Sequence, residues 1–366
     1  MTIPARFLFS LLVFAAAGGA AHAQFDQATS KALLEEYSLQ LFGNNATGYM
    51  GPLVVVSNVG AHHGFFHSAK MSKKDELRFE ISIQSVYTTV REDERTFTGT
   101  LPIDTLSGDS DVLRLFKLLA LVPARANGEL SDRITTATVF GGQGTWFRVP
   151  KKYLFFVPAE QLKNIPDSLQ LTNGTNQQTV FAAVPQLRIG TWKSTDMLLR
   201  YIPPVTFDKN VGKFSFFGVA FRHGFTNWFR QPVVNAAIEA SYQRSSINNI
   251  VGTTKAELDA TTDMWSVNVQ ASRRFGWFEP YVGISYENLY SNGTYKFTLP
   301  ANIKEQIGYD IDPQTAAISL DDHAFKGTIG VAAIIGPVDV FLSAGISKHF
   351  IIGGGVSYAF NVPTGR

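Results

Sequence analysis

The sequence predicts an all-β protein, a transmembrane antiparallel β-barrel of about 14 strands with a short N-terminal helix or plug segment. Three observations carry this prediction. The first residues have the pattern of an export signal. Most later segments alternate apolar and polar residues with period two, and the last of these ends on aromatic residues at alternate positions.

Residues 1–23 have the features of a signal peptide. Arg6 lies in a short positive leader, an apolar run extends over Phe7–Ala17, and Ala21-His22-Ala23 is a small-x-small cleavage site before Gln24. The apolar run is too short for a bilayer-spanning helix of about 20 residues. We therefore predict export with removal of residues 1–23, and a final location in the cell outer membrane.

The composition excludes several classes of protein. No later window approaches the roughly 18 uninterrupted apolar residues of a membrane helix, so the mature chain could cross a membrane only as a closed barrel. The absence of Cys argues against a small disulfide-stapled fold. A net charge of +2 gives no footprint for nucleic acid. A mean hydropathy of +0.02 with 29 Phe and 12 Tyr fits alternating strands with aromatic girdles.

The mature chain divides into three parts. Residues 24–60 are expected to hold a helix over Asp26–Leu41, ended by Gly43-Asn44-Asn45, and could plug the lumen. Residues 61–360 are expected to form the barrel, and residues 361–366 a periplasmic tail.

The barrel prediction depends on period-two alternation. Over Arg78–Tyr87 the odd-numbered positions are mainly apolar and the even-numbered ones mainly polar, and the same division recurs over Val234–Tyr242 and Trp265–Ala271. Short and long connections largely sort to opposite ends, as in outer-membrane barrels. Strands are expected to begin near residues 62, 77, 94, 134, 145, 180, 195, 211, 233, 263, 279, 324, 338 and 350.

A soluble β-sandwich would show the same alternation. The signal peptide, the even strand count with its asymmetric loops, and the final strand favour the membrane barrel. Charged residues also avoid the apolar phase of these strands, where an Arg or Lys at mid-depth would cost about 2–4 kcal/mol in lipid.

The last strand, Gly355-Val356-Ser357-Tyr358-Ala359-Phe360, resembles the C-terminal insertion signal of outer-membrane barrels, with Tyr358 and Phe360 at alternate positions. This resemblance implies recognition by the barrel-assembly machinery, and a final surrounding of membrane lipid and lipopolysaccharide.

The mature chain also resembles a family of uncharacterised outer-membrane barrels of Bacteroidetes-type genomes. The resemblance rests on three blocks, Gly64–Lys70, Val184–Thr191 and Gly218–His223, none of which is a catalytic motif. It implies no function that transfers residue by residue. In architecture, such a barrel with an N-terminal plug is distantly similar to the long-chain fatty-acid transporters of the outer membrane.

The inward phase of the predicted strands collects polar residues of both signs. They could form a hydrogen-bonded network that braces the barrel or holds a plug, or a polar pore lining that tunes selectivity. The lumen-lining candidates are Arg78, Glu80, Gln84, Arg188, Arg200, Glu239, Gln243, Asn268, Gln270, Arg274, Glu287 and Lys326.

A second candidate feature is an apolar helix over Asp111–Val122 in an external loop. Its residues Leu115, Phe116 and Leu119 could capture a small hydrophobic ligand, or the helix could merely pack over the barrel mouth.

No metal, other cofactor or enzyme activity is expected. His62, His63 and His67 are the only histidine cluster, and no carboxylate or Cys lies nearby in the sequence to complete a metal site. His223 or His323 could in principle act with a Ser, but the sequence has no G-x-S-x-G elbow.

Three hypotheses follow, in order of preference. The first is a barrel for uptake or passage of small hydrophobic or amphipathic molecules, gated by the N-terminal helix. The alternative is a closed structural, ligand-binding or partner-binding barrel without transport. The third is an enzyme in the barrel wall, for which His223 and His323 would be the residues to test.

Overall fold

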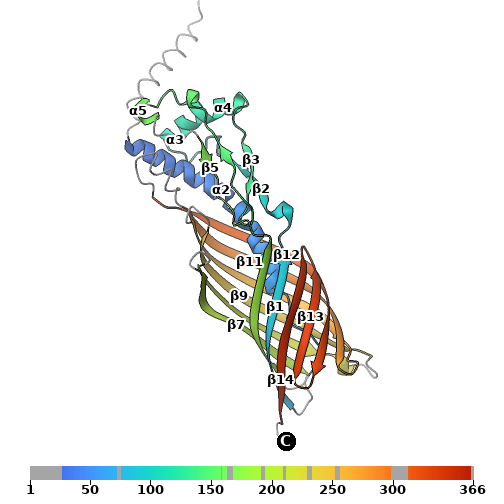
Figure 1. Ribbon diagram of the computed structural model, residues 1–366. Coiled ribbons are helices and arrows are strands. Elements are labelled where there is room, and N and C mark those ends of the chain that lie inside the picture. The colour runs from blue at the N-terminus through green and yellow to red at the C-terminus, as the bar shows by residue number, and fades with distance from the viewer. Residues whose placement is uncertain are drawn as a thin grey trace, which may run out of the picture.

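The computed structural model describes residues 27–71, 76–157, 159–162, 168–190, 194–208, 212–228, 233–251, 256–297 and 312–363. Its largest part is a closed antiparallel β-barrel (Figure 1). The predicted signal peptide, and residues 364–366 of the predicted tail, lie outside the described residues.

Ten strands close the barrel, and each pairs with its neighbour in chain order, while β1 closes the ring by pairing with both β14 and β6. The strands are β1 (Glu76–Thr89), β6 (Thr179–Gly190), β7 (Thr195–Asp208), β8 (Gly212–Gly224), β9 (Asn235–Val251), β10 (Ala256–Ser272), β11 (Phe278–Phe297), β12 (Gln314–Ile335), β13 (Val338–Ile346) and β14 (Phe350–Pro363). A 3-10 turn, η4 (Thr226–Trp228), follows β8.

The expected count of about 14 strands is therefore wrong, although the alternation located all ten barrel strands. Of the four extra strands, the one expected near residue 62 is a non-helical segment that follows the N-terminal helix. The other three correspond to short strands outside the barrel: those near residues 94 and 134 pair with each other, and the one near residue 145 pairs with a further short strand at Leu169–Gln170. Strand β14 also continues past Phe360, so part of the expected tail is strand.

The described residues between β1 and β6, 90–157, 159–162 and 168–178, form the cap domain at the end of the barrel away from the C-terminus (Figure 1). We call that end of the barrel the upper end, and the end at which β1 begins and β14 finishes the lower end. The elements of the cap domain are η1 (Glu92–Glu94), β2 (Thr96–Thr100), α3 (Asp111–Phe116), a π-helical turn η2 (Lys117–Leu121), α4 (Val122–Ala126), β3 (Arg133–Ala137), β4 (Trp146–Phe147), η3 (Lys151–Tyr153), α5 (Ala159–Leu162) and β5 (Leu169–Gln170).

A single long helix, α2 (Gln27–Ala61), joins the cap domain to the barrel lumen (Figure 1). Its first half contributes Leu33, Tyr37 and Leu41 to the apolar core of the cap domain. Its second half descends between the strands, where Tyr49 and Met50 pack with residues of β10 to β12. The helix does not stop at Gly43-Asn44-Asn45, contrary to expectation. Among the described residues, no helix has both the length and the hydropathy to cross a membrane.

The barrel wall has opposite chemistry on its two sides. In β12, burial alternates residue by residue, so that Lys326 and Thr328 are buried while Phe325 and Ile329 are 72% and 66% exposed. Every outward position of β12 from Phe325 to Ile335 is apolar or Gly. The lower half of the barrel therefore presents an apolar exterior and a polar interior.

Candidate functional site

Below α2 the chain runs down the lumen as a non-helical segment, residues 62–71, which we call the plug segment. Four cationic side chains of the barrel wall donate hydrogen bonds to backbone carbonyls of this segment or of Ala61 just before it. The pairs are Arg200 with Ala61 (2.7 Å) and His63 (3.0 Å), Lys326 with His62 (2.8 Å), Arg188 with Phe65, and Arg222 with Ser68.

These bonds explain how an irregular segment can occupy the lumen. Outside a helix or sheet, backbone carbonyls have no built-in partner, and a buried carbonyl without one costs free energy. The inward phase of the strands places long cationic side chains at the required positions, because alternate residues of a strand face the same side. The wall thus supplies the hydrogen bonds that the plug segment cannot make with itself.

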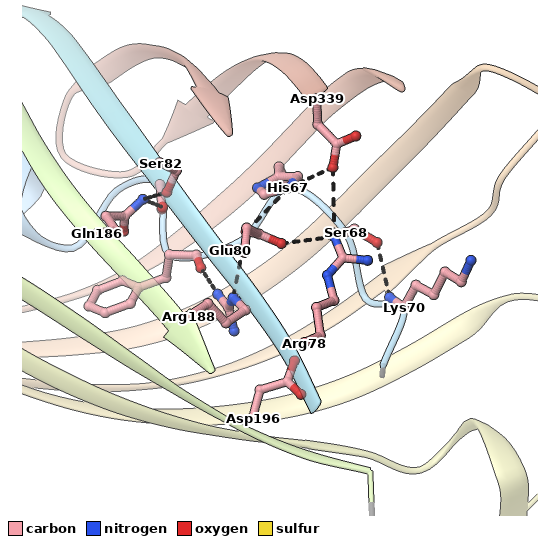
Figure 2. A network of polar contacts seen from close by, with 12 residues as sticks. His67, Ser68, Lys70, Arg78, Glu80, Ser82, Gln186, Arg188, Asp196 and Asp339 are labelled. Carbon is pink, nitrogen blue, oxygen red and sulfur yellow. Dashed lines mark hydrogen bonds and ion pairs between the residues drawn. The ribbon is translucent and has the colours of Figure 1, made fainter. Parts of the chain in front are cut away.

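The wall cations are in turn paired with wall carboxylates, as part of Figure 2 shows. Arg188 lies 3.4 Å from Glu239 and 4.0 Å from Glu80. Arg222 pairs with Asp196, and Lys326 with Glu287. Charges of both signs are therefore neutralised inside the lumen, which is the arrangement that buried ions require.

Arg200 is different from the other wall cations. It donates to the side-chain oxygens of Gln186 (2.7 Å) and Gln243 (3.2 Å) as well as to the plug carbonyls, and it stacks 3.7 Å above the ring of Phe65. Within the described part of the chain, no carboxylate lies within ion-pair distance of it. Its charge is held by neutral dipoles and an aromatic face.

His67, in the plug segment, sits between two wall carboxylates (Figure 2). Its Nε2 atom is 3.6 Å from Glu80 and 3.6 Å from Asp339, and its ring stacks on Phe341 with centroids 4.3 Å apart. Sequence reasoning placed Glu80 in the lumen but not beside His67, and it missed Asp339, which is far from residue 67 in the chain. Among the described residues, no group of three or more potential ligands has the geometry to hold a metal.

Wall glycines make room for the plug segment. A Cβ atom on Gly353 would come within 2.3 Å of the His63 ring, and one on Gly283 within 2.4 Å of Phe66. Gly64 of the plug segment has a φ of +75°, which an L side chain rarely adopts. Plug and wall therefore fit each other closely at these points.

Above the plug segment the lumen holds an apolar cavity of 230 Å³ between α2 and the wall. His63, Gln84 and Arg200 lie at its polar lower end. The apolar lining includes Met50, Leu53 and Val54 of α2, and Val180, Ala182, Val184, Ile202, Phe214, Phe216, Ile247, Leu258, Ala260, Met264, Ile318 and Leu320 of the wall. The lumen thus changes from polar below to apolar above.

A smaller chamber of 150 Å³ lies at the lower end of the barrel. Its lining carries both signs of charge, from Arg78, Glu80, Arg222 and Glu279 among others, together with His67. Its chemistry is opposite to that of the upper cavity, and the plug segment lies between the two.

The structure buries all of the lumen-lining candidates except two. Arg78 is partly exposed at the lower end, where it lies 3.0 Å from Glu80, and Arg274 is exposed in the turn after β10, where it bonds to Gly276. Sequence reasoning missed the apolar cavity. The sequence does contain a sign of this cavity, because inward-facing residues in the upper halves of the strands, such as Leu258, Ala260 and Met264, are apolar.

The ligand-capture candidates Leu115, Phe116 and Leu119 lie on the helical stretch expected over residues 111–122. All three are partly buried against the core of the cap domain, and Phe116 meets Tyr37 edge to face at 5.7 Å. Capture of a ligand by these residues and simple packing of the helix both stay predictions.

The remaining candidates are dispersed. Tyr358 and Phe360 are exposed on the lower part of β14, where Phe360 stacks on Phe79 at 5.4 Å. His223 lies near the lower end, 3.0 Å from the Thr195 hydroxyl, while His323 is exposed on β12. The two histidines are not brought together.

Comparisons with known proteins give one family. Residues 3–360 match a family described as "Family of unknown function (DUF6588)". No curated protein matches the sequence.

Solved structures that resemble the chain do so weakly. The translocator domain of the autotransporter NalP from Neisseria meningitidis is 8% identical, covers 88% of this chain and 99% of its own, and has a TM-score of 0.24. The outer-membrane expressed OmpT of Vibrio cholerae is 10% identical, covers 79% of this chain and 99% of its own, and has a TM-score of 0.20. Pseudomonas aeruginosa OccK2 is 8% identical, covers 80% of this chain and 100% of its own, and has a TM-score of 0.15. Structural similarities with TM-scores this low do not support a fold assignment. We therefore assign the barrel fold from the strand pairing of the chain itself.

Proposed function

The chain belongs to the DUF6588 family of unknown function, and we propose that it is an outer-membrane β-barrel that binds a small hydrophobic or amphipathic molecule in its lumen and takes part in its uptake. The apolar cavity of 230 Å³ beside α2 is the observation that carries the proposal. In this proposal the barrel has no catalytic role, and neither His223 nor His323 carries a reaction.

The apolar exterior supports placement in a membrane. From Phe325 to Ile335 the strand makes ten steps of about 3.3 Å, and a tilt of about 40° converts them to a height of about 25 Å, which is the apolar band of an outer-membrane barrel. In water such a surface would be far larger than the apolar patches that soluble monomers expose. Lipid and lipopolysaccharide would then surround the barrel, and Tyr358 and Phe360 would serve its assembly.

The cavity supports binding of an apolar molecule. An apolar cavity of about 150 Å³ stays dry and holds benzene. A cavity of 230 Å³ has room for a two-ring hydrocarbon, and an amphipathic ligand could turn its polar end toward His63, Gln84 and Arg200.

Binding of 1-fluoronaphthalene, followed by 19F NMR in lipid nanodiscs, tests this proposal. Ala260→Phe places a ring in the cavity, and Ala240→Phe makes the same change on the outer face of β9. We expect a bound signal in the natural protein and in Ala240→Phe, and binding weakened about ten-fold or more in Ala260→Phe, because overpacking costs about 1–3 kcal/mol. Equal signals in all three would mean partition into lipid only, and would refute the proposal.

The second candidate function is a closed structural or partner-binding barrel. The plug segment favours it, because four paired or stacked wall cations hold its carbonyls across the lower lumen. A natural protein that shows no bound 1-fluoronaphthalene signal would favour this second function.

A further inference from the structure

The barrel wall is not paired along its full height. Strands β6 and β7 pair only from Gln186 with Arg200 down to Gly190 with Asp196. Above this point residues 179–185 of β6 pair only with β1, as far as Thr179 with Thr89. Residues 201–208 of β7 pair only with β8. The upper halves of these two strands therefore have no ladder between them.

The sequence explains why the ladder stops here. Pro185 directly precedes Gln186, where the pairing of β6 with β7 begins, and continuing that register sets Pro203 opposite Ala183 and Pro204 opposite Ala182. Proline has no backbone N–H, so it cannot donate to a sheet ladder and is confined to strand edges and bulges. The β7–β8 register also shifts between Ile202 and Val205 and again between Thr206 and Asp208. Both edges of the gap thus consist of residues that resist pairing.

The gap and the apolar cavity share their walls. Val180, Ala182 and Val184 on β6, with Ile202 on β7, line the cavity. Ala182 is on the inward phase of β6 but is exposed, in contrast to Gln186 and Arg188 lower on the same phase, which are buried. The normal alternation of burial is lost where the partner strand is missing, and Ala182 is both part of the cavity lining and exposed there.

The outer surface beside the gap is apolar. Phe181 and Tyr201 are 68% and 56% exposed on its two sides, and Ile83 and Tyr87 face outward on the neighbouring β1. Unpaired strand edges are not tolerated in hydrocarbon unless they line a cavity or are otherwise satisfied. An opening in this surface therefore calls for a functional reason.

We propose that the gap between β6 and β7 is a lateral portal, through which a small hydrophobic molecule exchanges between the lumen cavity and the hydrocarbon of the membrane. This inference rests on the proposed function and names its route. The lower route is blocked by the plug segment and lined by charges, so an apolar molecule that took it would lose its apolar surroundings. The lateral route keeps the molecule in an apolar medium throughout.

A pair of single cysteines tests whether lipid reaches the cavity wall at the gap. The chain has no Cys, so Ala182→Cys and Ala260→Cys each give one labelling site. Both alanines line the cavity, but Ala182 is at the gap and Ala260 is on β10, away from it. Each is labelled with bimane in vesicles of acyl-chain-brominated lipid, and Ala240→Cys on the outer face of β9 serves as the lipid-exposed reference.

We expect brominated chains to quench the label at Ala182→Cys almost as strongly as that at Ala240→Cys, and to leave the label at Ala260→Cys bright. Quenching at Ala182→Cys no stronger than at Ala260→Cys would mean that β6 and β7 close in a membrane, and would overturn the portal.

A double variant tests whether the gap is the route of exchange. Continuing the register of Gln186 with Arg200 by two residues sets Val184 opposite Ile202, so Val184→Cys with Ile202→Cys can close the gap by a disulfide. The control is Ser241→Cys with Ser266→Cys, whose hydroxyls lie 2.7 Å apart across the paired β9–β10 ladder. Exchange of 1-fluoronaphthalene between lipid and protein is measured by 19F saturation transfer, before and after reduction.

We expect the disulfide at the gap to slow exchange about ten-fold and reduction to restore it, with no effect in the control. Bound ligand with an unchanged exchange rate would refute the portal alone. No bound ligand in the natural protein would refute the proposed function itself, so the two failures are distinguishable. If the disulfide does not form, the bimane result decides.

Discussion

At the residue scale, Arg200 concentrates the most contacts between plug and wall. It binds two backbone carbonyls, two amide side chains and one aromatic face, with no carboxylate within ion-pair distance among the described residues. Its planar fork of donors fits this arrangement, which a Lys could not reproduce. Arg200 is therefore the residue whose loss should release the plug segment most directly.

Arg200→Met should destabilise the protein by roughly 2–4 kcal/mol, because the carbonyl of His63 would stay buried without its donor and that of Ala61 would keep only the 3.2 Å bond from Gln243. Urea unfolding in detergent micelles measures the loss, and protease nicking of the plug segment should increase. The control is Arg244→Met, because Arg244 is exposed and its pair with Asp263 contributes about 0–1 kcal/mol. Equal stability of the two variants would contradict a plug held by Arg200.

A second residue-scale prediction concerns the cap domain, where the side chains of Asp109 and Lys117 are fully buried and lie 2.9 Å apart. Burial alone would raise the pKa of Asp109, but hydrogen bonds from the Leu106 amide, Gln40 and Lys117 outweigh burial and hold this pKa below its ordinary value. The pair's contribution is therefore complete above the unfolded pKa of about 4 and is lost as the pH falls through the lower folded pKa.

We expect the cap domain of the natural protein to lose stability below about pH 4, which the fluorescence of Trp146 would follow. We expect the Asp109→Asn variant to be less stable than the natural protein at pH 7, and its stability to depend less on acid. The mutant leaves Lys117 buried without a counter-ion, which costs about 3–5 kcal/mol. Glu129→Gln, in the exposed pair with Lys152, is the control and should change little. An acid profile that Asp109→Asn leaves unchanged would rule out this pair as its cause.

At the element scale, Asn45 fastens α2 to the cap domain. Its amide nitrogen donates to the Thr100 carbonyl at 2.9 Å, and its side-chain oxygen accepts from the Thr100 amide at 2.8 Å, so that it pairs with the edge of β2 as a strand would. Gly48 and Gly99 leave the space for this contact, since a Cβ on Gly48 would meet Phe97 at 2.4 Å.

Asn45→Asp should weaken this junction by about 1–3 kcal/mol, because a carboxylate would face the Thr100 carbonyl without a hydrogen to donate. Amide hydrogen exchange at Thr100 should accelerate, while amides of β12 in the barrel keep their protection. Asn44→Asp, at the exposed neighbouring position, is the control. Unchanged exchange at Thr100 in Asn45→Asp would show that α2 docks by apolar packing alone.

The same residue shows where local sequence reasoning fails. Gly43, Asn44 and Asn45 ordinarily end a helix, and Pro52 lies inside α2 as well, yet the helix continues to Ala61. Tertiary contacts override these local signals, because Asn45 finds its partners on Thr100 and not in a turn, and the lumen and cap domain bury one face of the helix. A single sequence does not show which distant residues will become partners of Asn45.

Strand location was predictable, but strand partnership was not. Alternation in β1, β9 and β10 set the inward and outward faces that the structure has, because period two is a property of each strand alone. The segments at β2, β3 and β4 have similar local patterns but pair within the cap domain, and nothing in their own residues says so. The gap between β6 and β7 is likewise a property of a pair, although Pro185, Pro203 and Pro204 mark it in the sequence.

At the scale of the whole molecule, α2 and the plug segment form one continuous stopper. The helix is anchored in the cap domain through Leu33 and Tyr37, crosses the apolar upper lumen, and continues as the cation-held segment that reaches the lower end. The upper part leaves the 230 Å³ cavity, whereas the lower part fits tightly against Gly283 and Gly353. Closure to ions should therefore depend on residues 62–70 more than on the helix.

Because the plug segment and not α2 is expected to close the lumen, the conductance of shortened chains in planar bilayers can be predicted. A chain that begins at Gln24 should conduct at background level, and so should one that begins at Ala61, because the wall cations would still hold the plug segment. A chain that lacks residues 24–70 should show steady current steps, since Arg188, Arg200, Arg222 and Lys326 would lose their carbonyl partners and the polar lower lumen would fill with water. A change of one wall charge checks that the current passes through the barrel lumen. Glu239→Gln in the shortest chain removes a negative charge from the wall and should shift the ion selectivity of the current toward anions. Steady current after removal of residues 24–60 alone would show that the helix, and not the plug segment, seals the barrel, and silence after removal of residues 24–70 would show a lumen closed by its own side chains.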